Sequence, residues 1–147
     1  MVRVLIIATL LLIIVIDIKK MYIPNLLNLF LLILAFYYKG LEPGMIEDGI
    51  IGMGVYCIPF VFIYGYLSDF LNKEVLGFGD IKLMLALGYI LGYSDFYQVY
   101  MFFVFSFLIS TIIGIIIGIG RGNFSSPIPF SPFIVFTFLY YWSSELV

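Results

Sequence analysis

The sequence has no histidine and only one cysteine, and these absences exclude several kinds of chemistry. Without histidine, no imidazole is present to act as a base near neutral pH or as a metal ligand. Cys57 has no second cysteine with which to form a disulfide or a paired-cysteine metal site. We therefore expect no metal and no cofactor, and any catalysis has to use carboxylates, hydroxyls, amides or lysines.

Charged residues are also scarce, at 11% of 147 residues, whereas 64% of the residues are hydrophobic. The mean hydropathy of +1.19 lies far above the range of soluble globular proteins. This composition predicts an integral membrane protein in which residues 1–147 form a single membrane-embedded domain with lipid around it. The few charges include no basic tract, so no nucleic-acid partner is expected.

The N-terminus has features of a signal peptide, because the letters MVR are followed by an apolar stretch from Val4 to Ile16. That stretch ends in Asp17, Ile18, Lys19 and Lys20, however, and not in the small residues that suit cleavage. We therefore interpret it as a retained helix.

Charges, prolines and glycines divide the chain into six apolar segments. A helix satisfies its own backbone hydrogen bonds in lipid, and the alternating pattern of a membrane barrel is absent. The predicted fold class is therefore an all-α integral membrane protein, a bundle of about six transmembrane helices. The shorter segments can cross only if their polar flanks continue the helix or charged side chains reach to the interface. The segments are about Val4–Ile18, Pro24–Tyr38, Ile50–Leu67, Ile81–Tyr93, Phe96–Ile119 and Phe133–Trp142.

Six crossings place the termini and the even-numbered loops on one side of the membrane and the odd-numbered loops on the other. The even side carries only Arg3 and Lys39 as basic residues. Because basic residues concentrate in cytoplasmic loops, we expect a multi-pass protein of the plasma membrane with both termini external. The basic residues on the odd-loop side are Lys19, Lys20, Lys73, Lys82 and Arg121.

Small residues recur at every fourth position along the fifth segment, as Ser106, Ser110, Gly114 and Gly118. This spacing puts them on one helix face, along which another helix can approach closely. We interpret the stripe as structural packing.

Two aspartates, Asp17 and Asp80, lie at the cytoplasmic ends of the first and fourth segments, at one predicted depth. An acid at the cytoplasmic edge does not help to orient the protein in the membrane, and its burial in hydrocarbon costs free energy. Both aspartates are therefore candidates for a functional role. Each also has a structural interpretation: Asp17 as a helix end screened by Lys19 and Lys20, and Asp80 as a helix N-cap. Together they favour catalysis, because two carboxyls around one water are sufficient for hydrolysis.

In such a pair, one ionised carboxylate removes a proton from water and the other, protonated, donates to the scissile carbonyl oxygen. Proximity and partial burial separate the two pKa values. Gly77 and Gly79 precede Asp80 and lack a β-carbon. They would let a substrate backbone approach the carboxyl, and they would allow left-handed dihedrals in this turn.

Four sequence features together carry a resemblance that covers almost the whole chain. They are Asp17, the stretch Ile23-Pro24-Asn25, the motif GFGDIKL from Gly77 to Leu83, and IPFSPF from Ile128 to Phe133. In order and spacing they look like the type IV prepilin peptidases and their archaeal preflagellin relatives, which are membrane aspartyl proteases of the GxGD type. The resemblance implies that Asp17 and Asp80 are the catalytic pair. It also implies cleavage of a basic leader from a pilin-like precursor at the cytoplasmic membrane face.

The chain departs from the family pattern in two respects. Larger bacterial members carry an additional N-terminal cytoplasmic region with paired cysteines and also methylate the new N-terminus. That region is not present here, so we expect an aspartic-type endopeptidase without methyltransferase activity. The family often has glycine where Ser131 stands, and the role of that position is left open.

Supporting roles near the aspartates have competing interpretations. Lys82 could tune the Asp80 carboxyl, bind lipid phosphate or simply extend to the interface. Asn25 could hold its loop against an aspartate or begin the second helix. Asp69 and Glu74 could attract a basic leader by charge complementarity or belong to a solvated loop.

Three other functions remain open at this point. A presenilin-like or signal-peptide-peptidase-like intramembrane protease shares the Gly-x-Gly-Asp motif, although those chains are larger. A small transporter would use Asp17 and Asp80 as coupling groups, but it is expected to show acids near the midplane or internal repeats. In a noncatalytic assembly subunit the acids would be dispensable. The identity of the precursor and the oligomeric state are not indicated.

Overall fold

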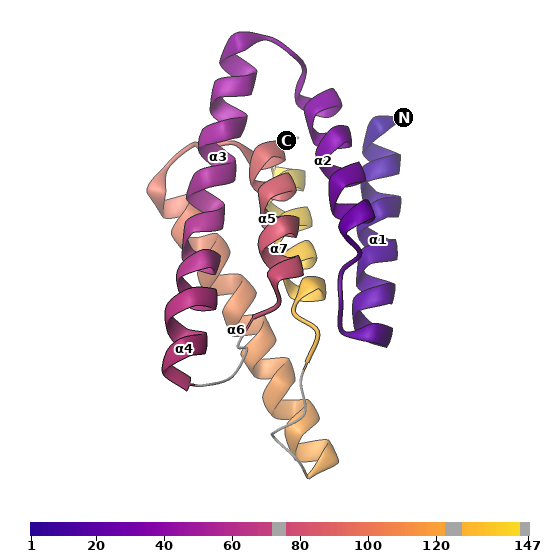
Figure 1. Ribbon diagram of the computed structural model, residues 1–147, viewed down its shortest axis with the longest axis vertical. Coiled ribbons are helices and arrows are strands. Elements are labelled where there is room, and N and C mark those ends of the chain that lie inside the picture. The colour runs from indigo at the N-terminus through magenta and orange to yellow at the C-terminus, as the bar shows by residue number, and fades with distance from the viewer. Residues whose placement is uncertain (72–75, 123–127, 145–147) are drawn as a thin grey trace.

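The computed structural model describes residues 1–71, 76–122 and 128–144, and the regular structure in these ranges is helical (Figure 1). Each of the six predicted apolar segments corresponds to a helix, although the second begins one residue before α2 and the fourth ends two residues after α5. The third continues through a π-helical turn, η1, into α4. The elements are α1 (Val2–Lys20), α2 (Asn25–Lys39), α3 (Pro43–Phe62), η1 (Ile63–Leu67), α4 (Ser68–Leu71), α5 (Phe78–Leu91), α6 (Phe96–Arg121) and α7 (Ser131–Ser144).

The third helix differs most from its predicted bounds, because α3 begins at Pro43 and not near Ile50. Proline fits the first helical position, where its missing N–H has no partner to lose, and Glu42 before it is extended. The acids at positions 47 and 48 are thus helical. Charge alone does not end a helix whose polar turn can lie outside the apolar layer.

Helix α5 is the centre of the bundle. It packs against α3, α2 and α7, and ten of its 14 residues are buried. A helix that is apolar on all sides is typical of such a position. Its contact with α3 is close: a β-carbon on Gly88 would lie 2.8 Å from the carbonyl oxygen of Gly52. Helix α5, which carries Asp80 in its first turn, is therefore enclosed by three neighbouring helices.

The predicted small-residue stripe lies on α6, which packs against α7. Ser106 and Gly118 are buried, and the two stripe residues between them are half-buried. A β-carbon on Gly114 would lie 3.2 Å from the Cδ1 atom of Ile128. The stripe thus lies against the rest of the protein along part of its length.

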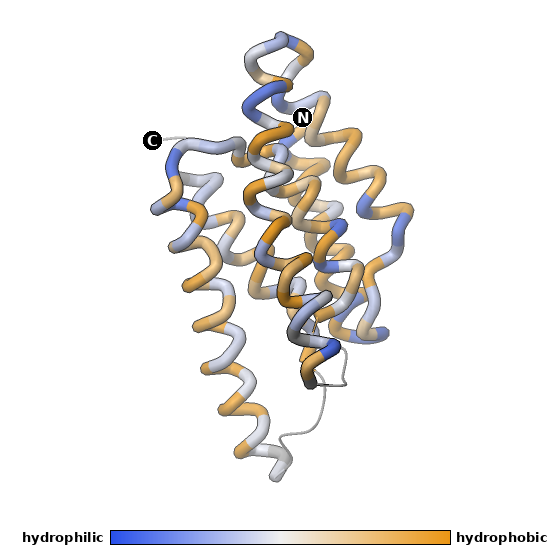
Figure 2. The backbone as a smooth tube through the Cα atoms, turned by 60° about the vertical axis from the view of Figure 1, so that its left-hand side comes forward, coloured by the Kyte–Doolittle hydropathy of each residue, from blue (hydrophilic) through white to orange (hydrophobic). Residues whose placement is uncertain are grey.

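Two helical stretches are long and apolar enough to cross a membrane by length and composition: Pro43–Phe70 and Phe96–Gly120. Helix α2 is apolar but shorter. Apolar residues run along most helices, with hydrophilic residues gathered towards helix ends and turns (Figure 2). Many large apolar side chains face outwards, among them Leu26, which is 76% exposed. The six crossings and the external termini stay predictions.

A polar cluster joins three helices at the C-terminal end of α5. Lys39, the last residue of α2, forms an ion pair with Asp48 of α3 at 2.5 Å and donates a hydrogen bond to the carbonyl of Tyr89 at 3.1 Å. Asp48 also accepts the N–H of Tyr93 at 2.9 Å. Gly92 takes a positive φ of 68° beside them, which a residue with a side chain adopts only with strain. We call Lys39, Asp48, Gly92 and Tyr93 the Lys39 cluster.

Candidate active site

Asp17 lies in the last turn of α1 and is only 6% exposed. Its Oδ2 atom accepts a hydrogen bond from the backbone N–H of Ser131, the first residue of α7, at 3.2 Å. Lys19 and Lys20 are exposed and form no ion pair with Asp17. The direct partner of Asp17 is therefore the backbone of α7 and not a lysine of its own helix.

Asp80 lies in the first turn of α5 and is 7% exposed. The N-cap of this helix is Gly77, which accepts the backbone N–H of Asp80 through its carbonyl at 3.0 Å, so the N-cap interpretation of Asp80 is also wrong. The Oδ1 atom of Asp80 is buried without a hydrogen-bond partner. A buried polar atom in this state is costly, which makes it a candidate for a functional role.

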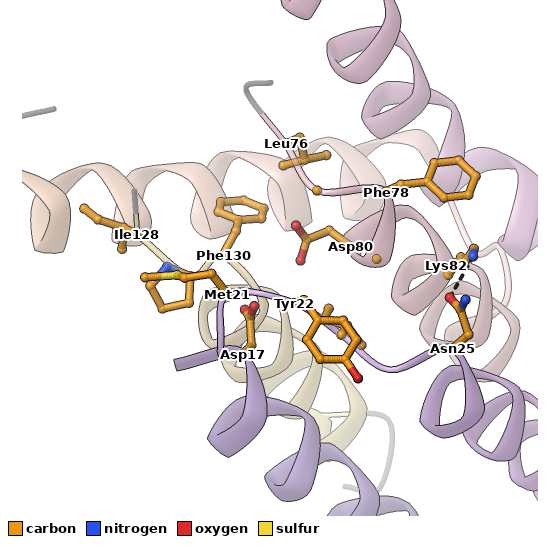
Figure 3. A pocket seen from close by; sticks show the side chains of 14 residues that line it. Asp17, Met21, Tyr22, Asn25, Leu76, Phe78, Asp80, Lys82, Ile128 and Phe130 are labelled. Atoms are coloured by element: carbon orange, nitrogen blue, oxygen red, sulfur yellow. Dashed lines mark hydrogen bonds between the residues drawn. The ribbon is translucent and has the colours of Figure 1, made fainter. Parts of the chain in front are cut away.

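The two aspartates line one pocket of about 520 Å³. In Figure 3 both carboxylates point into the same space, Asp17 from α1 and Asp80 from α5. Much of the wall comes from three stretches at or beside helix ends, residues 21–23, 76–79 and 128–130. The tertiary structure thus brings together three parts of the chain that the sequence motifs singled out.

The surroundings of Asp80 disfavour its charged form. Asp80 precedes the apolar segment that begins at Ile81, and burial, followed by repulsion from Asp17, raises the pKa of its carboxyl to about 7. A hydrogen bond from the backbone of Gly77 acts in the opposite direction. Near neutral pH, a large fraction of Asp80 therefore carries a proton that it can donate.

The two motif glycines lie where space is limited. Gly77 is extended, with φ −75° and ψ 139°, and Gly79 is helical, so neither uses the left-handed dihedrals that glycine allows. A β-carbon on Gly77 would lie 3.2 Å from Oδ2 of Asp80, and one on Gly79 would lie 3.0 Å from Cβ of Ile23. Space is therefore the constraint at both positions, beside the carboxyl and against the segment between α1 and α2.

Lys82 and Asn25 also line the pocket, but neither is bonded to an aspartate. The Nζ atom of Lys82 donates to Oδ1 of Asn25 at 2.7 Å and lies 4.8 Å from the centre of the Phe78 ring. Asn25 is the first residue of α2. The pair therefore links the N-terminal ends of α2 and α5 at the rim of the pocket, as the dashed line in Figure 3 shows.

The two acids predicted to attract a basic leader, Asp69 and Glu74, are not found in the pocket wall among the described residues. Asp69 is exposed on α4 and is not part of the pocket wall. Glu74 lies outside the described residues.

The sequence analysis did not identify two groups at the site, the side chain of Asn28 and the backbone N–H of Ser131. Asn28 is 5% exposed and donates through Nδ2 to the carbonyl of Gly79 at 3.2 Å, fixing the first turn of α5. An amide in an apolar helix is a usable signal for such a role. The backbone donor at Ser131 has none, because every residue except proline carries an N–H.

Comparison with known proteins agrees with these motifs. A sequence profile described as the type IV leader peptidase family matches residues 4–119. Over 84 residues the chain is 39% identical to a prepilin leader peptidase/N-methyltransferase of Vibrio cholerae serotype O1, which covers 53% of this chain. The chain spans 31% of the length of that relative. No solved structure matches. With most of its length matched by the family profile, the chain belongs to the type IV leader peptidase family.

Proposed function

We propose that this protein is a membrane aspartyl endopeptidase that removes the short basic leader from prepilin-like precursors. Family membership supports leader processing. The observation that carries the proposal is the burial of Asp17 and Asp80, from separate helices, in one pocket. Gly77, Gly79, Lys82 and Asn25 support the site by shaping the approach to the carboxyls and linking α2 to α5.

The proposed reaction needs only the two carboxyls and water. One carboxylate takes a proton from water as its oxygen attacks the scissile carbonyl carbon, and the other carboxyl donates its proton to the carbonyl oxygen. Collapse of the resulting diol breaks the C–N bond, and the protons pass to the leaving amine and back to the donor carboxyl. No cofactor enters this scheme.

The proposed substrate is a pilin, pseudopilin or archaellin precursor whose apolar helix lies in the membrane beside the enzyme. Six crossings with external termini would place the pocket at the cytoplasmic face of the plasma membrane. Exposed Lys19 and Lys20 near the pocket agree with that orientation. We also propose that the product is released without methylation, which the mass of its new N-terminus tests.

The test is cleavage of a pilin-type precursor by the purified protein in detergent. Asp17→Asn and Asp80→Asn should each lower the rate by about a thousandfold, because each removes one proton-transfer group. Glu47→Gln is the matched control, since Glu47 is exposed and outside the pocket. Near-native cleavage by either Asn variant would contradict the two-aspartate mechanism.

The same assay separates the other candidates. A presenilin-like protease would also cut an apolar segment that has no basic leader. If the protein is a transporter or an assembly subunit, the precursor should stay intact with the wild-type protein and with the Asn variants.

A further inference from the structure

We propose that Ser131 is a positioning residue: its backbone N–H, at the start of α7, makes Asp17 the base and leaves Asp80 as the proton donor. The inference rests on the proposed peptidase function and assigns the two roles that the function itself leaves open. Ser131 touches no substrate in this proposal and acts through Asp17.

The first observation is the contact itself. The N–H of Ser131 reaches Oδ2 of Asp17 at 3.2 Å, in a buried setting and across 114 positions of sequence. Ser131 begins a 14-residue helix, and the first N–H groups of a helix carry partial positive charge and no helical partner. A hydrogen bond from such a group to an ionised carboxylate is stronger than one to a neutral carboxyl. The contact therefore gives Asp17 a donor that suits a base, which accepts hydrogen bonds.

The second observation is the contrast with Asp80. No oxygen of Asp17 is buried without a partner, whereas Oδ1 of Asp80 is. An ionised carboxylate can only accept hydrogen bonds, so an orphaned oxygen penalises that form, while a protonated carboxyl carries a donor of its own. Between two acids in one pocket, the single shared proton is therefore held at Asp80.

The third observation concerns the Ser131 side chain. Ser131 is fully buried, and its Oγ atom has no hydrogen-bond partner in the described part of the chain. The hydroxyl therefore neither caps α7 nor bonds Asp17. What reaches Asp17 is the backbone, which makes the N–H and the hydroxyl separable by substitution.

Other charged or titratable groups near Asp17 do not supply this stabilisation. Tyr22, Asp80 and Lys82 line the same pocket, and Lys82 is bonded to Asn25. The neighbouring lysines on α1 are exposed. Among the described residues, Asp17 forms no ion pair, so the N-terminal end of α7 is its electrostatic partner.

With these roles the reaction is balanced. Asp17 takes a proton from water as the C–O bond forms, and Asp80 gives its proton to the carbonyl oxygen. When the C–N bond breaks, Asp17 passes its proton to the amine nitrogen and Asp80 recovers a proton from the diol. Both acids return to their starting states.

The experiment is the pH–rate profile of precursor cleavage by Ser131→Pro and Ser131→Ala. Proline removes the N–H and is accepted at the first residue of a helix. We expect Ser131→Pro to move the acid limb of the profile up by about one pH unit, because the base loses its stabilising donor. Ser131→Ala retains the N–H and should keep that limb at the wild-type pH. An unmoved acid limb in Ser131→Pro would overturn the proposal.

Phe96→Pro is the matched proline control. Phe96 is the first residue of α6, is 73% exposed and follows an extended Asp95, so proline fits there too. It should leave both limbs and the rate unchanged. If Ser131→Pro does not fold, an α-hydroxy acid at position 131 removes the same N–H and retains the side chain.

Infrared spectroscopy tests the assignment directly. At pH 6 the wild-type protein should show a protonated-carboxyl band that is absent from Asp80→Asn and present in Asp17→Asn. A band lost in Asp17→Asn and kept in Asp80→Asn would reverse the roles and overturn the inference. If both Asn variants cleave at native rates, the proposed function fails. If both are inactive and the acid limb is unmoved in Ser131→Pro, only the assignment fails.

Discussion

The two ends of α5 treat acidic side chains in opposite ways. At the C-terminal end, Asp48 meets Lys39 at 2.5 Å and accepts the N–H of Tyr93. At the N-terminal end, Asp80 shares a pocket with a second acid, Asp17, and keeps one oxygen without a partner. Asp48 and Asp80 both lie beside apolar helices. They therefore differ in their bonding partners and not in the kind of residue around them.

This difference agrees with the proposal that the N-terminal end of α5 serves chemistry, while the C-terminal end serves stability. Opposite charges with satisfied hydrogen bonds hold the ends of α2, α3 and α5 together. Two like acids in a pocket oppose folding and persist only where the rest of the structure holds them. The Lys39 cluster contacts the C-terminal end of α5, and Asp80 lies in the first turn of the same helix. The cluster therefore helps to hold the helix that carries Asp80.

The largest effect should come from breaking the acidic pair completely. The Asp17→Asn, Asp80→Asn double variant should cleave no more slowly than either single variant, each about a thousandfold below wild type. The two acids act as one unit, so the second change has nothing further to remove. Single-turnover cleavage measures this. A double variant much slower than both single variants would show independent contributions.

A second prediction concerns pH. Since the pKa of Asp80 is raised to about 7, the protonated donor is lost as pH rises through that value, and cleavage should fall about tenfold for each further pH unit. Rates from pH 6 to pH 9 measure this basic limb. A rate that is constant to pH 9 would contradict the donor role.

Substitutions in the Lys39 cluster should lower the stability of the fold. Lys39→Met leaves Asp48 without its cation and should destabilise the fold by about 2 kcal/mol, below the figure for a fully buried pair because Asp48 is 41% exposed. Thermal unfolding in detergent measures the loss. Adding Asp48→Asn should restore part of it, since the unpaired charge is then removed. A double variant less stable than Lys39→Met would contradict this.

Removing an acid at the N-terminal end of α5 should instead raise the stability of the fold. Asp80→Asn should raise the unfolding temperature relative to wild type at pH 8. An acid with a raised pKa stabilises the fold less as pH rises from its unfolded value near 4 to its folded value near 7. The difference between the two proteins should therefore be smaller at pH 4. Equal unfolding temperatures at both pH values would contradict the prediction.

The smallest effect is expected at the exposed rim. Asn25→Ala removes the acceptor of Lys82, and an exposed contact of this kind contributes about 0.5 kcal/mol. Cleavage should fall by less than about tenfold. A loss as large as that of Asp80→Asn would place this contact within the chemistry.

The sequence predicted the pieces of the site better than their contacts. Asp17, Asp80 and the two glycines were predicted because acids and flexible residues beside apolar runs are unusual, and the structure places all four at one pocket. The sequence did not decide the conformation of Gly77, because glycine allows both positive φ and close contacts, and only the neighbouring atoms distinguish the two. Lys82 and Asn25 were assigned separate roles because a bond across 57 positions leaves no local pattern.

What the sequence by itself determined is the lipid surroundings and the candidate reactive groups. Long apolar runs require helices, and in a chain without histidine two aspartates at the ends of apolar segments are the candidates for moving protons. What only the tertiary structure decided is which partners those acids have. A backbone N–H from α7 reaches Asp17 and no donor reaches Oδ1 of Asp80. That asymmetry depends on distances between helices far apart in the chain, and the residue types are the same at both positions.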